Sequence, residues 1–326
     1  MTIRHQRDGM TRRELLRRGT LAVGALAIPG WIYPAYGAWQ QAAPPAGDPL
    51  EAMRKQMGAP PIERVKLTDN LTMLSGPGGN VVVLTGPDGK IVVDTFVQPA
   101  WSKLQDALQQ LGSGPIQTVI DTHWHFDHAD NNANFRKAGA TVLAHENTRK
   151  RMSETHKLLG MTFPASPADA LPTRTFKDTH TLSANGEQIA LGYIPPAHTD
   201  TDIYIRFSKG NVLHLGDLFF NGMYPFIDAG TRGSVGGMIN GADMALKLAD
   251  GTTRIVPGHG PLATREDLTK YRDMLVTVRD RVQALKKGGN TLDQVIAAAP
   301  TKDLDPIWGK GFMQAKDFIA IVYNTL

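Results

Sequence analysis

The sequence predicts a mixed α/β fold, and three observations point to it. Short runs rich in Val, Ile and Leu stop at Gly, Pro or Asp, as the strands of a sheet do. Between them lie segments whose apolar residues recur every three or four positions, which is typical of amphipathic helices. The two kinds of segment alternate along a chain of 326 residues that is 41% hydrophobic. This order favours layered sheets and helices around one main core over a helical bundle or an all-β barrel.

The elements are expected in a definite order. The chain opens with strands, and the turn Pro87-Asp88-Gly89 joins two of them in a hairpin. Strands and helices then alternate, and a charged amphipathic helix begins at Arg265. The predicted strands are 71–74, 81–84, 91–93, 118–120, 142–144, 189–194, 203–207, 212–215 and 254–256. The predicted helices are 101–111, 129–137, 148–159, 238–249 and 265–282, with shorter ones near 292–298 and 313–323.

The first 37 residues are typical of a twin-arginine export signal. Arg12 and Arg13 precede an uncharged run over 19–31, which is too short to span a bilayer as a stable helix. Ala35-Tyr36-Gly37 is a plausible cleavage site. We therefore expect recognition by the twin-arginine export machinery, a periplasmic location and no stable membrane span. The alternative is a basic, disordered N-terminus.

The remaining chain divides into three predicted regions. The small residues and prolines of Ala42 to Gly47 predict a linker over 38–61. The main α/β domain follows over 62–274, and a helical C-terminal extension occupies 275–326. Nothing in the sequence indicates the oligomeric state.

Charge and composition exclude several classes of function. Six of the 35 basic and two of the 31 acidic residues lie in the leader, so the rest of the chain holds 29 of each sign. Such a neutral chain has no basic excess for a nucleic-acid backbone, and we expect a small-molecule substrate instead. The chain has no cysteine, which excludes disulfides, thiolate metal ligands and iron–sulfur chemistry. Any metal must be bound by His, Asp or Glu.

One short run carries most of the chemical information. His123-Trp124-His125-Phe126-Asp127-His128 supplies four candidate metal ligands directly after a predicted strand and before a predicted helix. Sites in open α/β sheets form at this end of the strands. Three further candidates follow later predicted strands, namely His198, Asp217 and His259, and the last lies between Gly258 and Gly260. Taken alone, each of these three is more often a core or loop residue.

Together the four blocks resemble the metallo-β-lactamase superfamily, over roughly Val65 to Met274. The resemblance implies a four-layer αβ/βα sandwich carrying a helical C-terminal extension. It also implies two Zn²⁺ ions per chain, with Fe or Mn as alternatives. His123, His125 and His198 would hold one ion, Asp127, His128 and His259 the other, and Asp217 would bridge both. A hydroxide between the metals would attack the substrate, with Asp127 as a catalytic residue that orients it and moves a proton.

Other residues are candidates for supporting roles. Asp94, Asp121 and Asp202 lie at strand ends or turns, where their carboxylates could orient the ligand imidazoles. The aromatic segment from Phe219 to Ile227 follows Asp217. Three of its residues are expected to wall the substrate pocket and to favour an apolar or aromatic group, namely Phe219, Tyr224 and Phe226. An ordinary core segment is an equally good interpretation.

The complete His and Asp set is similar to the glyoxalase II, lactonase and phosphodiesterase branches of the superfamily. β-Lactam hydrolysis is then at most a side activity, because the three β-lactamase groups each depart from this set at one position. The sequence therefore predicts an exported dinuclear zinc hydrolase of small esters, lactones, thioesters or related substrates. Two alternatives stay open: an iron-dependent oxidoreductase similar to persulfide dioxygenases, and a non-catalytic metal-binding scaffold.

Overall fold

Two β-sheets carry the architecture of the computed structural model, which describes residues 48–326. The first sheet has seven strands in the order β1-β2-β3-β4-β5-β6-β9, antiparallel from β1 to β4 and parallel from β4 to β9. Its strands are β1 (Glu63–Lys66), β2 (Leu71–Ser75), β3 (Asn80–Leu84), β4 (Lys90–Val93), β5 (Ile116–Ile120), β6 (Thr141–His145) and β9 (Arg174–Phe176). The predicted signal peptide and the linker up to residue 47 lie outside the described residues.

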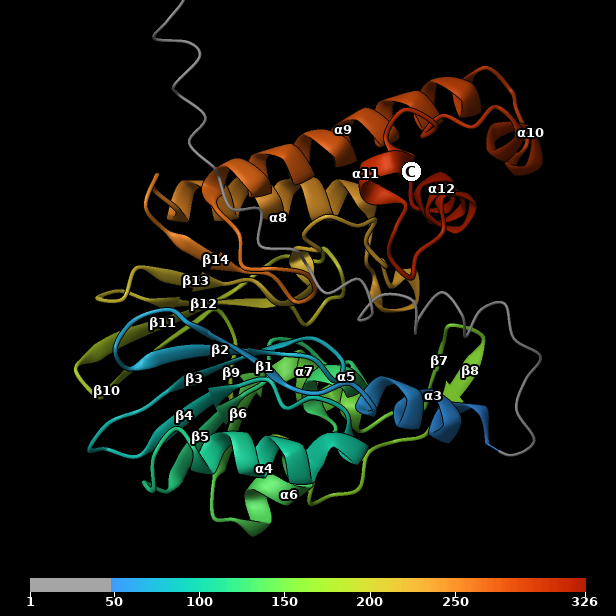
Figure 1. Cartoon of the computed structure of the whole chain (residues 1–326). Helices are drawn as coiled ribbons and strands as arrows, with labels where there is room; N and C mark the ends of the chain where they lie inside the picture. Colours follow the sequence, from blue (N-terminus) through green and yellow to red (C-terminus); the bar gives the residue numbers. More distant parts are fainter. Residues whose placement is uncertain (1–47) are drawn as a thin grey trace, which may run out of the picture. The chain divides into compact units, whose positions relative to one another are not determined.

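The second sheet has five strands in sequence order and supplies the other half of the sandwich (Figure 1). Its first four strands are antiparallel neighbours, and the last pair is parallel. The strands are β10 (Thr179–Ala184), β11 (Glu187–Tyr193), β12 (Ile203–Phe207), β13 (Val212–His214) and β14 (Arg254–Val256). A separate short hairpin pairs β7 (His156–Leu158) with β8 (Met161–Phe163).

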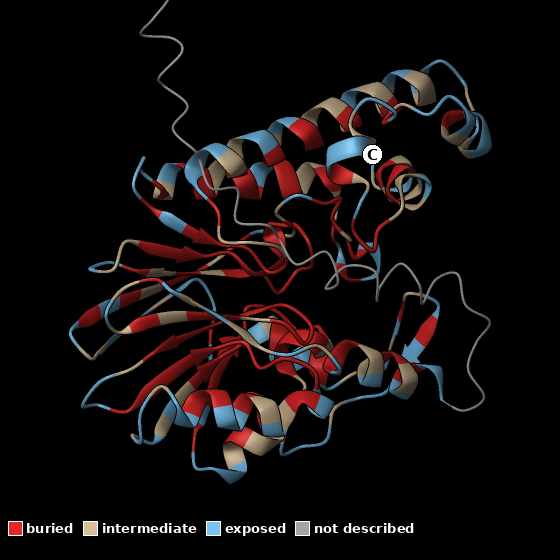
Figure 2. Cartoon of the chain, viewed as in Figure 1, coloured by how far each residue is buried: buried red, intermediate tan, exposed pale blue. Residues whose placement is uncertain are grey.

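Side-chain alternation explains how the sheets become layered. Successive residues of a strand point to opposite faces. In β3, Val82 and Leu84 face the second sheet and pack with Ile189 and Ile205, whereas Val81 and Val83 pack with Leu104 of a helix. Burying both faces requires helices outside each sheet, and in Figure 2 the central strands are largely red while the outer helix faces are mostly tan or pale blue. The predicted four-layer α/β sandwich is confirmed.

The helices form the two outer layers. Figure 1 shows α4 (Trp101–Gln109) and α6 (Asn132–Lys137) outside the first sheet, and α8 (Val235–Leu248) with α9 (Arg265–Lys287) outside the second. Thr264 begins α9 with a capping box that it shares with Asp267. The remaining helices are α3 (Pro49–Gly58), α5 (Phe126–Ala129), α7 (Glu146–Met152), α10 (Leu292–Ala297), α11 (Asp305–Trp308) and α12 (Ala315–Asn324). Among the described helices none has the length and apolarity that a membrane crossing needs.

The C-terminal helices belong to the main core. Tyr271, Trp308 and Phe318 are buried in the same cluster as Leu213 and Ile255 of the second sheet. Helix α9 also runs through the boundary that the sequence predicted at residue 274. The last 52 residues therefore share the hydrophobic core of the second sheet.

Two predicted elements were wrong. The helix expected over 148–159 ends at Met152, and the β7–β8 hairpin follows, because Leu159-Gly160 forms a tight turn with φ of 52° and 77°. Part of the predicted linker is helix α3, whose first turn is capped by Asp48 and whose Leu50, Met53 and Met57 are buried. The predicted helix over 129–137 corresponds to the shorter helix α6, since α5 already ends at Ala129. Five strands were not predicted, namely β1, β7, β8, β9 and β10.

Candidate metal centre

The histidine-rich run lies in a buried loop at the carboxyl end of β5. Asp94, at the end of β4, fixes the start of this loop by accepting hydrogen bonds from the Thr122 backbone N–H (2.8 Å) and hydroxyl (2.9 Å). Asp94 itself has a φ of 65°, a conformation that aspartate tolerates better than most residues. Local hydrogen bonding therefore holds His123 directly beside the strand end.

The other three candidates come from the second sheet. His198 follows β11, Asp217 lies in a short 3₁₀ turn after β13, and His259 follows β14. Gly258 is required here, because a Cβ atom at this position would lie 1.9 Å from Asp217 Oδ1. The ends of strands from both sheets thus meet at one point.

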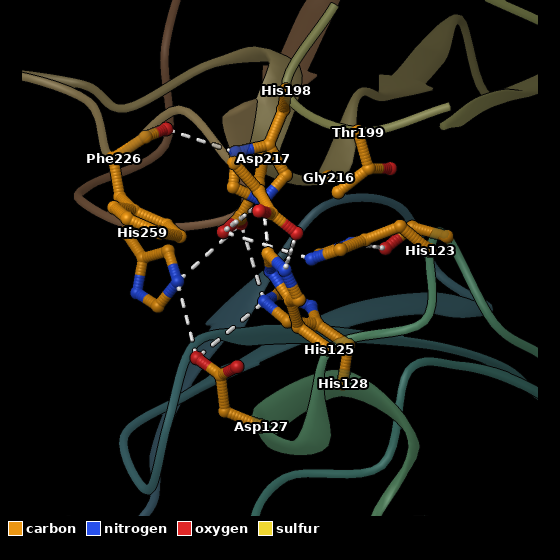
Figure 3. A network of polar contacts seen from close by, with 12 residues as sticks. His123, His125, Asp127, His128, His198, Thr199, Gly216, Asp217, Phe226 and His259 are labelled. Carbon is orange, nitrogen blue, oxygen red and sulfur yellow. Dashed lines mark hydrogen bonds and ion pairs between the residues drawn. The ribbon is translucent and has the colours of Figure 1, made fainter. Parts of the chain in front are cut away.

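The seven predicted ligands form two groups of side chains (Figure 3). The first group is His123, His125, His198 and Asp217, and the second group is Asp127, His128 and His259. Within each group the potential ligand atoms all lie within 4.8 Å of one another. These are the two sets of residues that the family resemblance assigned to two ions, with Asp217 grouped with the first set.

Asp217 lies between the two groups. Its Oδ2 is 3.8 Å from His123 Nε2 and 3.5 Å from His198 Nε2, both of the first group. Its Oδ1 is 3.2 Å from His128 Nε2 and 3.4 Å from His259 Nε2, both of the second group. One oxygen faces each group, as a bridging carboxylate requires.

Hydrogen bonds at the opposite ring nitrogens determine which imidazole atoms are available. His198 Nδ1 donates to the Phe226 carbonyl (2.9 Å), and His128 Nδ1 donates to Asp94 Oδ2 (2.7 Å). The Thr122 hydroxyl has given its proton to Asp94, so it accepts from His123 Nδ1 (3.0 Å). Each Nε2 faces a carboxylate oxygen of Asp217 at 3.2–3.8 Å and is the nitrogen that remains for a metal.

In His125 the roles of the two ring nitrogens are exchanged relative to the other three histidines. Its Nε2 lies 3.3 Å from Asp228 Oδ2, which leaves Nδ1 as the available atom. That Nδ1 lies 2.9 Å from His198 Nε2. This contact is a hydrogen bond whose donor depends on the tautomers of the two rings, and it brings together the two nitrogens through which these rings could bind a cation.

The charges of the two groups differ. Burial lowers the pKa of His198 to about 4 and the pKa of His123 well below its usual value, so these rings are neutral. Burial has the same tendency at His259, but Asp217 and Asp127 outweigh it and raise its pKa to about 9. Burial would raise the pKa of Asp217, yet His259 and His128 hold it well below the ordinary value. Positive charge on His259 and His128 balances the two buried carboxylates here, and divalent cations bound at the same place would supply that charge instead.

The donor atoms of the two groups are of the kinds that bind metal ions. Among the described residues, His123 Nε2 is buried and accepts or donates no hydrogen bond. The donor set contains only imidazole nitrogens and carboxylate oxygens, which suit zinc and neighbouring divalent metals. The residues therefore fit a pair of metal ions.

Three carboxylates were expected to orient the imidazoles, and only Asp94 does so. Asp121 accepts from the Asn132 side chain (2.8 Å) and contacts none of the described ligand rings. Asp202 accepts from the backbone N–H groups of His198 (2.8 Å) and Thr199 (2.9 Å), so it positions the loop and not the ring. The residue that the sequence reasoning missed is Asp228, which contacts His125.

Asp228 is held rigidly by the turn that follows it. It accepts hydrogen bonds from the Gly230 backbone and from the Thr231 hydroxyl. Burial opposes its ionisation, but the hydrogen bond and charge of His125 lower its pKa to about 2. The other carboxylates were predicted because they lie at the ends of strands, and Asp228 does not. The only hint in the sequence was that Asp228 directly follows the aromatic segment.

The predicted pocket residues separate into two kinds. Phe226 lines a small cavity of about 30 Å³ together with His125, Asp127, Asp217 and His259. Phe219 and Tyr224 do not line this cavity, which corrects the prediction: Phe219 packs on Tyr271, and Tyr224 stacks on Phe318 and donates to Asp305. Segments outside the motif supply further lining residues, namely Phe126, Leu158, Leu159 and Phe312.

Residues 74–261, more than half of the chain, match the metallo-beta-lactamase superfamily, and the chain belongs to that superfamily. Among solved structures it is similar to a metallo-beta-lactamase from Pontibacter korlensis, with a TM-score of 0.56 and 16% identity over 66% of this chain and 99% of that one. It is also similar to the stereoselective inverting sec-alkylsulfatase Pisa1 from Pseudomonas sp., with a TM-score of 0.59 and 16% identity over 89% of this chain and 54% of that one. At such identities the likeness shows the fold.

A curated relative gives a shorter match. The chain is 29% identical over 133 residues to the 2,4-dinitroanisole O-demethylase subunit alpha of Nocardioides sp. (strain JS1661). The match covers 40% of this chain, and it spans only about two fifths (38%) of that relative's length.

Proposed function

We propose that this protein is a dinuclear metal-dependent hydrolase that cleaves small-molecule esters, lactones, thioesters or related substrates. The observation that carries the proposal is the position of Asp217, whose two carboxylate oxygens face two separate groups of metal-type side chains. A structural role alone gives no reason for seven such side chains to converge in the interior. Four of the seven also line a cavity, namely His125, Asp127, Asp217 and His259.

The residues of this chain divide the work. His123, His125 and His198 would hold one ion, Asp127, His128 and His259 the other, and Asp217 would contact both. When bound, zinc ions would supply an acidified water molecule and an electrophile for the substrate oxygen. Asp127 borders the cavity and lies 3.4 Å from His259 Nε2, so it is placed to orient water and to accept a proton. The histidines and Asp217 keep that position fixed.

The similar proteins support a bond-cleaving enzyme acting on small organic molecules. Those named above are called a metallo-beta-lactamase, a sec-alkylsulfatase and a subunit of an O-demethylase. We further propose export by the twin-arginine route to the periplasm, on the basis of Arg12, Arg13 and the apolar run after them.

Metal analysis and a substrate panel test the proposal together. The purified full-length chain should contain two zinc ions by elemental analysis. It should hydrolyse at least one class among p-nitrophenyl esters, lactones, thioesters, aryl sulfates, aryl phosphates and a chromogenic cephalosporin. His259→Ala should retain the fold by circular dichroism and lose that activity. One metal per chain, or full activity in His259→Ala, would overturn the dinuclear assignment. Bound iron with O₂ uptake would favour an oxidoreductase instead.

A further inference from the structure

The cavity beside the candidate metal centre has an unusual wall. Apart from four of the metal-type residues, all its lining side chains are apolar: Phe126, Leu158, Leu159, Phe226 and Phe312. No lysine or arginine is among these described lining residues. Its volume of about 30 Å³ is small, since one water molecule alone needs ~10–15 Å³ on the same measure. Against the apolar part of this wall a charged group would lose its hydration without gaining a lysine or arginine partner.

The wall is assembled from four separate parts of the chain, one of which is the loop after Asp217 that carries Phe226. Phe126 begins α5 directly inside the motif, Leu158 and Leu159 come from the β7–β8 hairpin, and Phe312 comes from the segment between α11 and α12. Phe126 also packs against Phe163 of β8 at a ring distance of 5.2 Å, which ties the hairpin to the motif. Phe126 and Phe226 belong to the ligand loops, whereas Leu158, Leu159 and Phe312 come from other segments and can be altered without changing those loops.

Leu159 occupies a position that ordinarily disfavours leucine. Leu158 pairs with Met161, so Leu159 and Gly160 form a two-residue turn, and their φ values are 52° and 77°. Turns with two positive φ angles strongly prefer Asn or Gly at the first position. A leucine there is strained, because its Cβ atom crowds the following carbonyl oxygen. Such strain in a residue that borders a site indicates a role for its side chain.

A second hairpin of the same molecule carries the residues that such a turn ordinarily prefers. The β10–β11 turn has Asn185 and Gly186 with φ of 53° and 75°. Asn185 bonds to Asp88 and Gly89, at the end of β4 opposite to Asp94. The two turns have similar geometry, but only the one beside the metal centre carries leucine.

We propose that Leu159 and Phe312 limit the acyl group of the substrate, so that the site selects uncharged esters of short apolar acids. This inference rests on the proposed function. In the reaction, the oxygen of water bonds to the acyl carbon, the carbon–oxygen bond to the leaving group breaks, and the leaving alcohol takes a proton. The small acyl group lies against the apolar wall, and the leaving group extends toward solvent. Anionic sulfate and phosphate esters gain no charged partner from the wall.

The test uses the zinc-loaded chain and substrates that share one leaving group, phenol. Phenyl acetate should be hydrolysed with the highest kcat/KM, phenyl butyrate at least about tenfold more slowly, and phenyl sulfate and phenyl phosphate least. Leu159→Gly relieves the positive φ and removes the side chain, so it should fold at least as stably. It should raise the butyrate-to-acetate ratio of kcat/KM by about tenfold or more. Phe312→Leu should shift the same ratio by a smaller factor.

The control is Asn185→Gly, which makes the same kind of backbone change far from the centre and should leave the ratio unchanged. A direct binding measurement uses acetophenone, an uncharged ketone that is not hydrolysed. Calorimetry should show weaker binding to Leu159→Asn, which keeps the turn and removes the apolar contact. Unchanged ratios and unchanged acetophenone binding, or a preference for the anionic esters, would overturn the inference while the hydrolase remains established. Two bound metals with no cleavage of any ester on the panel would count against the proposed function itself.

Discussion

The two groups of metal-type side chains are built differently, although they share Asp217. In the first group, His123, His125 and His198 are at most 3% exposed, and partners in the loops hold their second nitrogens. In the second group, Asp127 is 8% and His259 is 9% exposed, and both border the cavity. The histidines of the first group are thus slightly more enclosed, although His125 also borders the cavity, and the most exposed donors, Asp127 and His259, belong to the second group. We therefore expect the first group to retain metal longer and the second to contact the reacting groups.

Removing the shared residue should have the largest effect. Asp217→Ala takes away the only carboxylate that faces both groups within the described part of the chain. The variant should lose both metal ions and all measurable hydrolysis. Elemental analysis and the substrate panel check this. Retention of one full equivalent of zinc would show that the first group is sufficient without a bridging carboxylate.

A change in Gly258 should reproduce much of that effect without altering any ligand. The new Cβ atom in Gly258→Ala would meet Asp217 Oδ1 at 1.9 Å and must displace it. We expect metal content to fall and stability to drop by about 1–3 kcal/mol in chemical denaturation. Gly251→Ala is the matched control, because its Cβ would meet nothing within 4 Å. Equal metal content in both variants would contradict the expectation.

Two carboxylate variants separate the groups from each other. Asp94→Asn weakens the hydrogen bond to His128, and Asp228→Asn weakens the contact with His125. Each should reduce metal affinity or activity by about 10–100-fold. In a chelator titration, Asp94→Asn should accelerate loss of the metal of the second group, and Asp228→Asn loss of the first. If both variants lose the same metal first, the two groups are not independent.

The smallest effect should come from Tyr224. Its hydroxyl donates to Asp305 at 2.8 Å, and its ring lies in the C-terminal part of the core rather than at the cavity. Tyr224→Phe should cost about 1 kcal/mol of stability and leave kcat/KM unchanged. Phe226→Ala, by contrast, should alter KM because Phe226 lines the cavity. Thermal unfolding and steady-state kinetics on the same two variants distinguish these outcomes.

Local patterns predicted most of the strands and the long helices, and they failed where distant residues decide. The run 148–159 has residues that suit a helix, yet β7 forms because β8 pairs with it and Phe163 packs on Phe126. Helix α3 was missed because a stretch of prolines and alanines precedes it, although Leu50, Met53 and Met57 have helical spacing. Asp121 and Asp202 show the same limit. Their positions in the sequence predicted that they lie near the site, but could not predict which groups they would bond to.

The sequence by itself determined the ligand chemistry of this protein. The chain has no cysteine, so imidazole and carboxylate are the donors that it can offer to a metal. The motif from His123 to His128 and the three later residues His198, Asp217 and His259 each follow a strand, which predicts that they meet at the strand ends. Only the tertiary structure decided what surrounds those donors. Asp228, Leu159 and Phe312 come from segments without a motif, and they reach the site because the loop after Asp217, the β7–β8 hairpin and the C-terminal segment pack there. Packing between distant segments leaves no periodic signal along the chain, and for that reason it had to be seen in three dimensions.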